Sequence, residues 1–273
     1  MTPPSGPDGQ DTALGRYGES LFEAAHPREA ERIDDAAVVY DPVTTHRLRA
    51  LGAGPGLRCL EVGAGTGTVA RWLLREAGVD EVVALDRDTG ALERGGDEPG
   101  LRVVTADLTD GSLDLGTFDL VHARFVLMHL PERRRVVSRL AGLLNPGGRI
   151  LLGDAVELPD RLDASRAYRR TMDAMWEALR ETIGTDITHV PAYPRFLREE
   201  GLAEVAAEAY CPPLTPGGPL ARFWSGTWRR MRPELEAPGR LDPATVDEAL
   251  AQLDSPHLAE LAPGMLLAWG RRA

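Results

Sequence analysis

The sequence contains no lysine, so its 31 strongly basic residues are all arginine. This absence excludes enzymes that depend on a lysine Schiff base or on a P-loop lysine. Cysteine is scarce as well, because only Cys59 and Cys211 occur, without the CxxC spacing of a zinc site. We therefore expect neither a bound metal nor a disulfide framework, which fits a reducing, cytoplasmic setting.

Long apolar runs are also missing. Residues 1–11 are rich in Pro, Gly and polar side chains, and no run of 18 apolar residues follows, so we expect neither secretion nor a membrane span. The 42 acidic residues outnumber the basic ones and give a net charge of -11, which disfavours nucleic acid as a partner. With 43% hydrophobic and 27% charged residues, the composition is that of a folded globular protein.

Short apolar runs alternate with helical patterns along the middle of the chain. Helical spacing of apolar residues is clearest at residues 68–77 and 131–144. Strands that alternate with helices predict an α/β fold with a doubly wound, mostly parallel sheet and helices on both faces. The predicted strands are residues 58–62, 81–85, 101–105, 118–122 and 149–153.

Other helical patterns lie outside this alternation. Residues 19–25 and 29–39 precede the first strand, and residues 164–182 carry an apolar stripe that includes Met172 and Trp176. Residues 212–263 add further helices between turns rich in Pro and Gly. Extra helices of this kind often line a pocket, although an individual aromatic residue more often packs in the core.

The most informative motif is Glu61-Val-Gly-Ala-Gly-Thr-Gly67, which ends the first strand and begins a helix. Alternate glycines permit a tight turn and close approach of a ligand, next to an open helix N-terminus. The residues from Gly65 to Ala70 also match the dinucleotide pattern G-x-G-x-x-A. A nicotinamide dinucleotide is therefore an alternative ligand for this turn.

Two aspartates follow the next two strands. Asp86 ends the second strand, and a carboxylate at that position can accept hydrogen bonds from both ribose hydroxyls of an adenosine. Asp107 follows the third strand and could accept a hydrogen bond from an adenine amino group. Both features suit NAD and other adenosyl ligands equally.

Five segments in this order resemble the class I S-adenosylmethionine-dependent methyltransferases, in particular their small-molecule branch. The resemblance implies a seven-stranded Rossmann-like sheet, with a sixth strand near residues 204–210 and an antiparallel last strand at residues 265–269. It also implies a turn at residues 145–148, an N-terminal helical lid and helical insertions. The five segments are residues 60–67, 83–86, 106–107, 118–130 and 144–151.

The resemblance further implies S-adenosyl-L-methionine as the cofactor. The glycine loop would approach its methionine part, the acid ending the second strand would hold the ribose, and the residues after the third strand would contact the adenine. The end of the fourth strand would border the sulfonium and the acceptor. Tyr17 in the predicted lid could bond the cofactor carboxylate or simply pack. The predicted cofactor-binding residues are Tyr17, Glu61, Gly63, Gly65, Gly67, Asp86, Arg87, Asp107, Leu108, His122 and Ala123.

The interpretation is a methyltransferase acting on a small specialised metabolite, aromatic or hydrophobic. The alternatives are an NAD-dependent oxidoreductase and a non-catalytic protein that binds an adenosyl ligand, and a homodimer is left open. The predicted division is an N-terminal tail and lid at residues 1–51, a cofactor-binding core at 52–155, a helical substrate insert at 156–203, and the end of the core sheet with a helical insertion at 204–273.

A sulfonium methyl group is already activated, so a catalytic base is needed only when the acceptor carries a proton. His189 and Tyr193 in the predicted insert, and His122 at the end of the fourth strand, are the catalytic candidates. His129 precedes Pro131 at the start of a helix, and we expect it to have a structural, hydrogen-bonded role.

Overall fold

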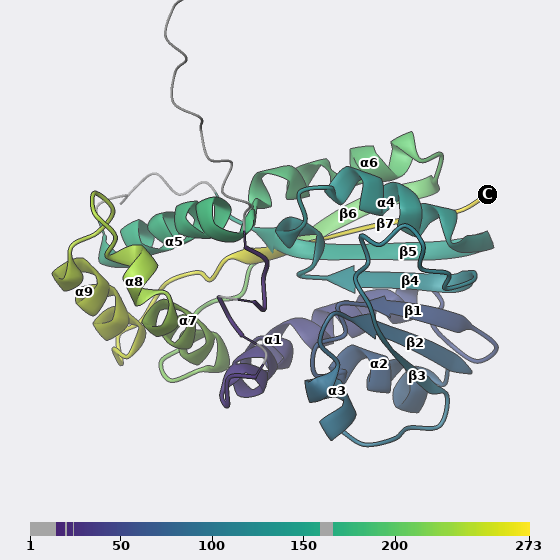
Figure 1. Cartoon of the computed structure of the whole chain (residues 1–273), viewed down its shortest axis with the longest axis horizontal. Helices are drawn as coiled ribbons and strands as arrows, with labels where there is room; N and C mark the ends of the chain where they lie inside the picture. Colours follow the sequence, from purple (N-terminus) through teal and green to yellow (C-terminus); the bar gives the residue numbers. More distant parts are fainter. Residues whose placement is uncertain (1–14, 20, 24, 159–165) are drawn as a thin grey trace, which may run out of the picture.

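The computed structural model describes residues 15–19, 21–23, 25–158 and 166–273. A seven-stranded sheet with the order β3-β2-β1-β4-β5-β7-β6 forms its centre (Figure 1). Strand β7 is antiparallel to β5 and β6, which confirms the predicted sheet and its antiparallel last strand. The strands are β1 (Arg58–Val62), β2 (Glu81–Asp86), β3 (Leu101–Thr105), β4 (Phe118–Arg124), β5 (Leu144–Val156), β6 (Ala203–Tyr210) and β7 (Gly264–Arg271).

Alternate residues of the central strands point to opposite faces of the sheet, as the pleat requires. Leu120 of β4 is buried in the same hydrophobic cluster as α1 and α2, whereas its neighbour Val121 is buried with α4 and α6. The sheet therefore has helices on both faces. The helices concerned are α1 (Glu29–Ala50), α2 (Thr68–Trp72), α4 (Arg133–Gly142) and α6 (Tyr193–Glu199), with α3 (Gly90–Arg94) beside α2.

Several elements differ in extent from the sequence prediction. The helix predicted at residues 68–77 is α2 followed by a π-helical turn, η1 (Leu73–Ala77). The turn predicted at residues 145–148 lies within β5, where Gly147 has a φ of 79° and the pairing with β4 shifts register. Strand β5 thus begins with an irregular segment, which combines the features of a turn and of a strand.

The helix predicted at residues 19–25 is wrong for the described part of that segment. Its residues form turns and an isolated bridge between Tyr17 and Leu21, and Phe22 has a φ of 61°. A bulky residue with positive φ is incompatible with a right-handed helix. Parts of other predicted segments, namely residues 1–14, Ser20, Ala24 and 159–165, lie outside the described residues.

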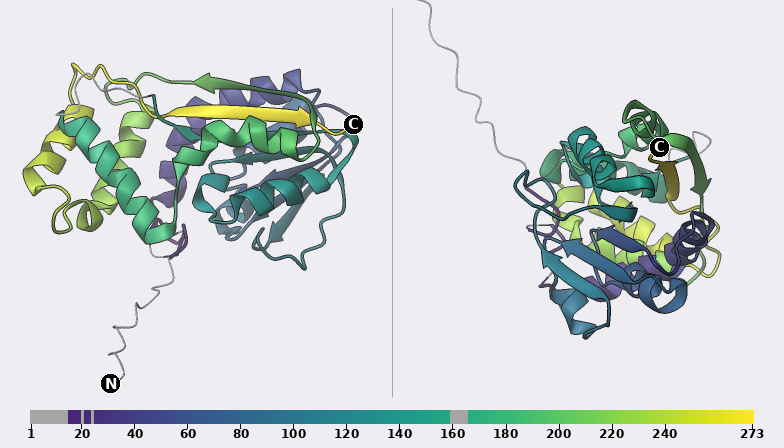
Figure 2. Two further views of the ribbon diagram at one scale, coloured as in Figure 1. Left: turned by 90° about the horizontal axis from the view of Figure 1, so that it is seen from above. Right: turned by 90° about the vertical axis from the view of Figure 1, so that its right-hand side faces the viewer.

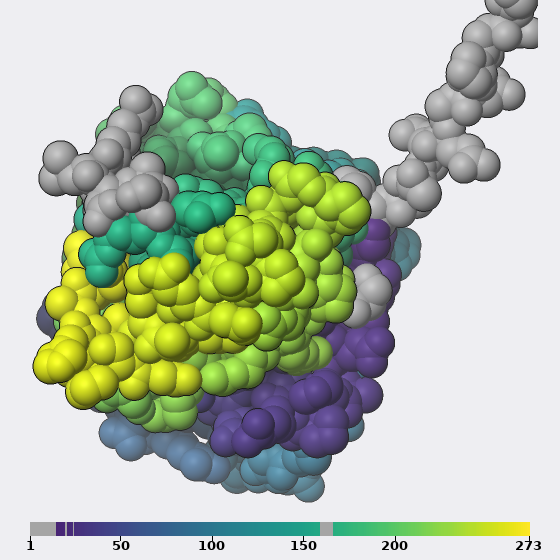
Figure 3. Space-filling view, turned by 90° about the vertical axis from the view of Figure 1, so that its left-hand side faces the viewer, coloured from purple at the N-terminus to yellow at the C-terminus, as the bar shows by residue number. Residues whose placement is uncertain are grey.

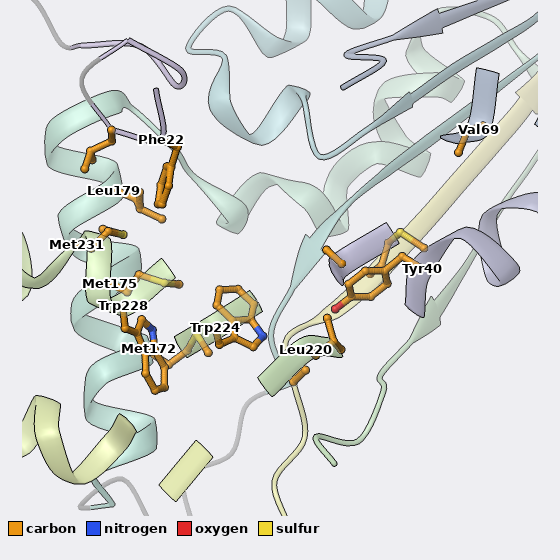
Figure 4. Packing of buried hydrophobic residues seen from close by; sticks show 14 of the residues in the cluster. Phe22, Tyr40, Val69, Met172, Met175, Leu179, Leu220, Trp224, Trp228 and Met231 are labelled. Atoms are coloured by element: carbon orange, nitrogen blue, oxygen red, sulfur yellow. The ribbon is translucent and has the colours of Figure 1, made fainter. Parts of the chain in front are cut away.

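A group of helices lies beyond the carboxyl ends of the parallel strands (Figure 1). The views in Figures 2 and 3 place the segment of α7 to α9 between α5 and the N-terminal part of the chain. Residues Met172, Met175 and Leu179 recur at helical spacing on α5 and pack with Trp224 and Trp228 of α7 (Figure 4). These helices are α5 (Ala167–Ile183), α7 (Pro219–Arg230), α8 (Arg232–Leu235) and α9 (Pro243–Leu253).

Two short 3-10 helices complete the fold: η2 (Leu127–His129) follows β4, and η3 (Ile187–Ala192) follows α5. Within the described residues, no helix combines the length and the apolar character that a membrane crossing requires.

Candidate active site

The glycine loop between β1 and α2 is held against the end of β2. Gly63 and Gly65 have positive φ values of 66° and 56°, which glycine adopts without the strain that other residues would incur. The amide of Gly63 donates to the carbonyl oxygen of Leu85 at 2.8 Å, and the amide of Gly65 donates to the carboxylate of Asp86 at 2.8 Å. These hydrogen bonds connect the loop after β1 to the end of β2. We call the glycine loop and the end of β2 together the rim.

Asp86 is therefore part of this rim as well as a candidate ligand contact. Its second carboxylate oxygen accepts a hydrogen bond from the amide of Asp88 at 3.1 Å. Burial raises the pKa of Asp86, and the hydrogen bonds from the backbone amides oppose that rise. A carboxylate oxygen has more than one acceptor position, so Asp86 can still accept from a ligand.

Residues 15–19 lie across the strand ends as a strap. Arg16 forms an ion pair with Asp107, and Arg87 forms one with Glu19. A guanidinium nitrogen of Arg87 also lies 3.3 Å from the carbonyl oxygen of Tyr17. Burial opposes ionisation of Asp107, but hydrogen bonds from Thr109 and the charge of Arg16 give a net lowering of its pKa. The strap is thus fixed by charges at the ends of β2 and β3.

A buried polar cluster follows the strap and joins it to α1 and α7. Arg32 donates to the Tyr17 hydroxyl at 2.7 Å and to Glu29 at 3.0 Å through Nε, and it lies 3.2 Å from Thr227 Oγ1. Arg230 forms a second ion pair with Glu29. Glu29 and Arg32 expose only 2% and 7% of their surface. We call these five residues the strap cluster.

A cavity of about 920 Å³ extends from the glycine loop to the strap cluster and the helices beyond it. At the strand ends its walls are polar, with the glycine loop, Asp86 and Asp107. At the other end they are mostly apolar and aromatic. The lining residues at that end include Tyr17, Phe22, Arg32, Tyr40, Met175, Trp176, Leu179, Ile183, Phe223, Trp224 and Thr227.

His129 lines this cavity from η2. Its Nδ1 lies 2.8 Å from Thr185 Oγ1, and its ring lies against that of Tyr17 with centroids 4.4 Å apart. Burial, together with the nearby charges of Arg32 and Arg133, lowers its pKa to about 3. The imidazole is therefore neutral at physiological pH. The structural hydrogen bond predicted for His129 is present, but the ring also faces the cavity.

Most of the predicted cofactor residues line the cavity, and three do not. Gly67 is the N-cap of α2, where an added Cβ would meet Leu92 at 2.2 Å. His122 is fully buried, with Nδ1 2.6 Å from Glu61 Oε2, and it reaches the cavity only through that glutamate. Ala123 lies buried in β4. The predicted residues that line the cavity are Tyr17, Glu61, Gly63, Gly65, Asp86, Arg87, Asp107 and Leu108.

The three residues predicted to be catalytic do not line the cavity. The side chain of His189 is 48% exposed and lies 3.2 Å from Asp186, which also caps η3. Tyr193 is fully buried, and its hydroxyl donates to Asp154 at 2.5 Å. His122 lies behind Glu61. The structure thus corrects their placement, because local capping and pairing turn these side chains away from the acceptor space.

Asp154 connects Tyr193 to the segment that carries His129. The same oxygen that receives the Tyr193 hydroxyl also accepts from the amide of Met128 at 3.1 Å, while its other oxygen is buried without a partner in the described structure. Burial raises the pKa of Asp154 to about 7. Tyr193 and Asp154 therefore help to hold η2 in place through the hydrogen bond to Met128.

Sequence reasoning missed Arg32, Phe223 and Trp224 as lining residues. The aromatic residues of α7 recur at helical spacing, but that pattern is equally typical of a core helix. Nothing in the sequence marks Arg32 as a residue that lines a cavity, because a single arginine is common on an amphipathic helix. No group of three or more potential metal ligands occurs within the described ranges.

Comparison with known proteins gives consistent results. A family described as a methyltransferase domain matches residues 60–150. The chain is 28% identical to the methyltransferase GfsG of Streptomyces halstedii over 68% of this chain and 67% of that protein. It is 29% identical to the 27-O-demethylrifamycin SV methyltransferase of Amycolatopsis mediterranei (strain S699), over 70% of each chain.

Another relative is longer than the matching region. An uncharacterized 37.1 kDa protein in transposon TN4556 of Streptomyces fradiae is 29% identical over 58% of this chain, and the match spans 49% of that protein. The chain therefore spans about half the length of this relative.

Solved structures share the fold at lower identity. An O-methyltransferase family protein from Burkholderia thailandensis superimposes with a TM-score of 0.56 at 19% identity, covering 95% of this chain and 64% of that one. Phosphoethanolamine N-methyltransferase 2 of Haemonchus contortus, in complex with phosphomonomethylethanolamine and S-adenosylhomocysteine, gives 0.53 at 17% identity, covering 85% and 52%.

Proposed function

We propose that the chain is a class I methyltransferase that uses S-adenosylmethionine to methylate a small hydrophobic molecule. The observation that carries this proposal is a continuous cavity that joins the polar strand ends to an aromatic chamber. Its size lies within the range typical of small-molecule sites. Similarity to a rifamycin methyltransferase over 70% of the chain supports a specialised metabolite as the acceptor.

The strand-end part of the cavity fits an adenosyl cofactor. A Cβ added at Gly65 would meet no atom closer than Ile33 Cγ2 at 3.7 Å, so the loop is open on this side. Asp86 would hold the ribose hydroxyls, and Asp107 with Leu108 would face the adenine. When bound, S-adenosylmethionine supplies a methyl group activated by its sulfonium.

His129 is the side chain that we assign as proton acceptor. When its Nδ1 donates to Thr185 Oγ1, its Nε2 carries a lone pair. S-adenosylmethionine would supply the methyl group and keep the electrons of its carbon–sulfur bond. The acceptor hydroxyl, which becomes strongly acidic as its oxygen takes up the methyl group, would pass its proton to His129 Nε2 even though burial and Arg32 lower the pKa of the imidazole. Tyr17, whose ring lies against the imidazole at an angle of 32°, limits the orientation of the imidazole.

Calorimetric titration separates this proposal from an NAD-dependent oxidoreductase. We expect S-adenosylhomocysteine to bind in the micromolar range and NADH to give no heat. Asp86→Ala should weaken S-adenosylhomocysteine by about 1.5 to 3 kcal/mol, because a charge-assisted acceptor is lost. Asp114→Ala is the matched control, since this exposed aspartate caps a distant turn at Gly116. Binding of NADH in place of S-adenosylhomocysteine would refute the proposal.

A protein that only binds an adenosyl ligand would give the same titration. Incubation with methyl-labelled S-adenosylmethionine and a panel of hydrophobic alcohols and phenols distinguishes the two. Transfer of label to any member supports the enzyme. Cofactor binding without transfer to the whole panel supports the binding protein instead.

A further inference from the structure

The acceptor end of the cavity contains a resident cation. Arg32 lines the cavity although it is 93% buried, and its guanidinium is held by Tyr17, Glu29 and Thr227. These contacts come from the strap, from α1 and from α7, so three separate segments fix its position. A guanidinium stays charged at any physiological pH.

This guanidinium lies over two of the aromatic rings that line the chamber. Its Cζ is 4.5 Å from the centroid of Phe22 and 4.9 Å from that of Phe223, and both rings line the cavity. Arg230 approaches the same Phe22 ring at 5.3 Å. Aromatic faces bind ammonium groups through their quadrupole, and here two of them already hold arginine.

The nearby acid offsets only one of two positive charges. Glu29 is paired with both Arg32 and Arg230, so this group of three ionised side chains has a net formal charge of +1. Among the described lining residues, the other acidic side chains lie in or after strands β1, β2 and β3, apart from the exposed Glu132. His129 is neutral and therefore leaves this charge unchanged.

We propose that Arg32 determines specificity by making this chamber select uncharged hydroxyl compounds over ammonium compounds of the same shape. The inference rests on the proposed function, since it concerns the acceptor that the chamber binds. An ammonium group entering the chamber loses water, meets a fixed like charge, and finds the rings of Phe22 and Phe223 occupied. A neutral hydroxyl compound loses much less hydration free energy, meets no like charge and can bond to His129.

The test uses two probes of similar shape, 2-naphthol and 2-naphthylmethylammonium, with protein saturated with S-adenosylhomocysteine. Calorimetry at pH 7 should show naphthol binding at least about tenfold more tightly than the ammonium probe. Arg32→Met, which removes the charge but keeps an unbranched apolar side chain, should tighten the ammonium probe about tenfold and change naphthol less than threefold.

Two controls keep the result interpretable. Arg32→Lys retains the charge and should keep the preference of the wild type. Arg222→Met removes a surface arginine of α7 that pairs with Asp35, and it should also leave the preference unchanged. If Arg32→Met does not fold, Arg32→Gln, which removes the charge but keeps hydrogen-bond donors for Tyr17 and Glu29, takes its place with the same expected result.

The outcomes are separable from those of the proposed function. Failure of the wild type to bind S-adenosylhomocysteine would refute the methyltransferase proposal itself. Normal cofactor binding, combined with an ammonium probe that binds as tightly as naphthol or with no measurable naphthol binding, would overturn the role of Arg32 alone. So would an Arg32→Met protein whose preference equals that of the wild type.

Discussion

The two ends of the cavity are built in different ways. At the strand ends, the ligand-facing groups come from the short turns after β1, β2 and β3, and backbone hydrogen bonds between neighbouring strands hold them. At the acceptor end, they come from the strap, α1, η2, α5 and α7, and side-chain packing holds them. The first end therefore depends on a local motif, and the second on the assembly of distant segments.

This contrast has a consequence for mutation. A glycine of the loop cannot be replaced without loss of binding, because the same residue must adopt a positive φ and leave space for the ligand. A residue of the chamber shares its role with several neighbours, so its replacement should alter selectivity or rate before it abolishes binding. The predictions below test this difference, beginning with the largest expected effect.

Gly65→Val should abolish detectable binding of S-adenosylhomocysteine, a loss of more than about 100-fold. The branched side chain would strain a backbone with a φ of 56° and would occupy the ligand space. Gly56→Val is the matched control, because Gly56 has a φ of 84° and an added Cβ there meets nothing within 4 Å. Calorimetry on folded protein decides, and equal affinity in the two variants would remove the glycine loop from the cofactor site.

His129→Ala should lower kcat about 100-fold while cofactor affinity stays within a few-fold, since a general base contributes to the chemical step. His257→Ala, an exposed histidine near the C-terminus, serves as the control. Steady-state kinetics with the best acceptor from the panel provides the measurement.

His189→Ala belongs in the same experiment because the sequence favoured His189 as the base. Its exposed position predicts a kcat close to that of the wild type. A loss in His189→Ala equal to that in His129→Ala would restore the interpretation made from the sequence.

Asp154→Asn should produce the smallest effect, a change in how stability depends on pH. The pKa of Asp154 is about 7 in the fold, above its usual value of 3.8, so the folded state holds a proton that the unfolded state releases between these values. The wild type therefore loses stability as pH rises from about 4 through 7. The asparagine variant lacks this loss, so its stability relative to the wild type should be greater at pH 8 than at pH 4, by at most about 4 kcal/mol.

Urea unfolding at pH 4, 6 and 8 measures this change. Asp114→Asn is the exposed control and should follow the wild type at each pH. Parallel pH curves for Asp154→Asn and the wild type would show that Asp154 is ionised in the fold.

Prediction from the sequence was most accurate where the structure depends on residues that are close together in the sequence. The first three strands were located to within a residue, because buried parallel strands form short apolar runs with clear ends. The helix predicted at residues 19–25 was wrong because Leu21 and Phe22 match helical spacing but are buried in an irregular segment that follows the strap. The ring of Phe22 packs under Arg32, a contact that lies outside any local window.

The histidines show the same limit. His189 and His129 both lie close to aromatic residues in the sequence, and a pattern cannot show the direction of an imidazole ring. Asp186 holds His189 near the surface, whereas Thr185, only one residue earlier, holds His129 against the cavity. Thr185 and Asp186 are adjacent in the chain, yet one holds a histidine against the cavity and the other holds a histidine near the surface.

The sequence by itself determined the order of strands along the chain, the glycine loop and the acid at the end of β2, because these depend on backbone conformation and on spacing within one strand–turn–helix unit. The tertiary structure alone decided the acceptor chamber. Its walls come from segments as far apart as Tyr17 and Thr227, and the position and charge environment of each side chain depend on the partners that folding brings to it.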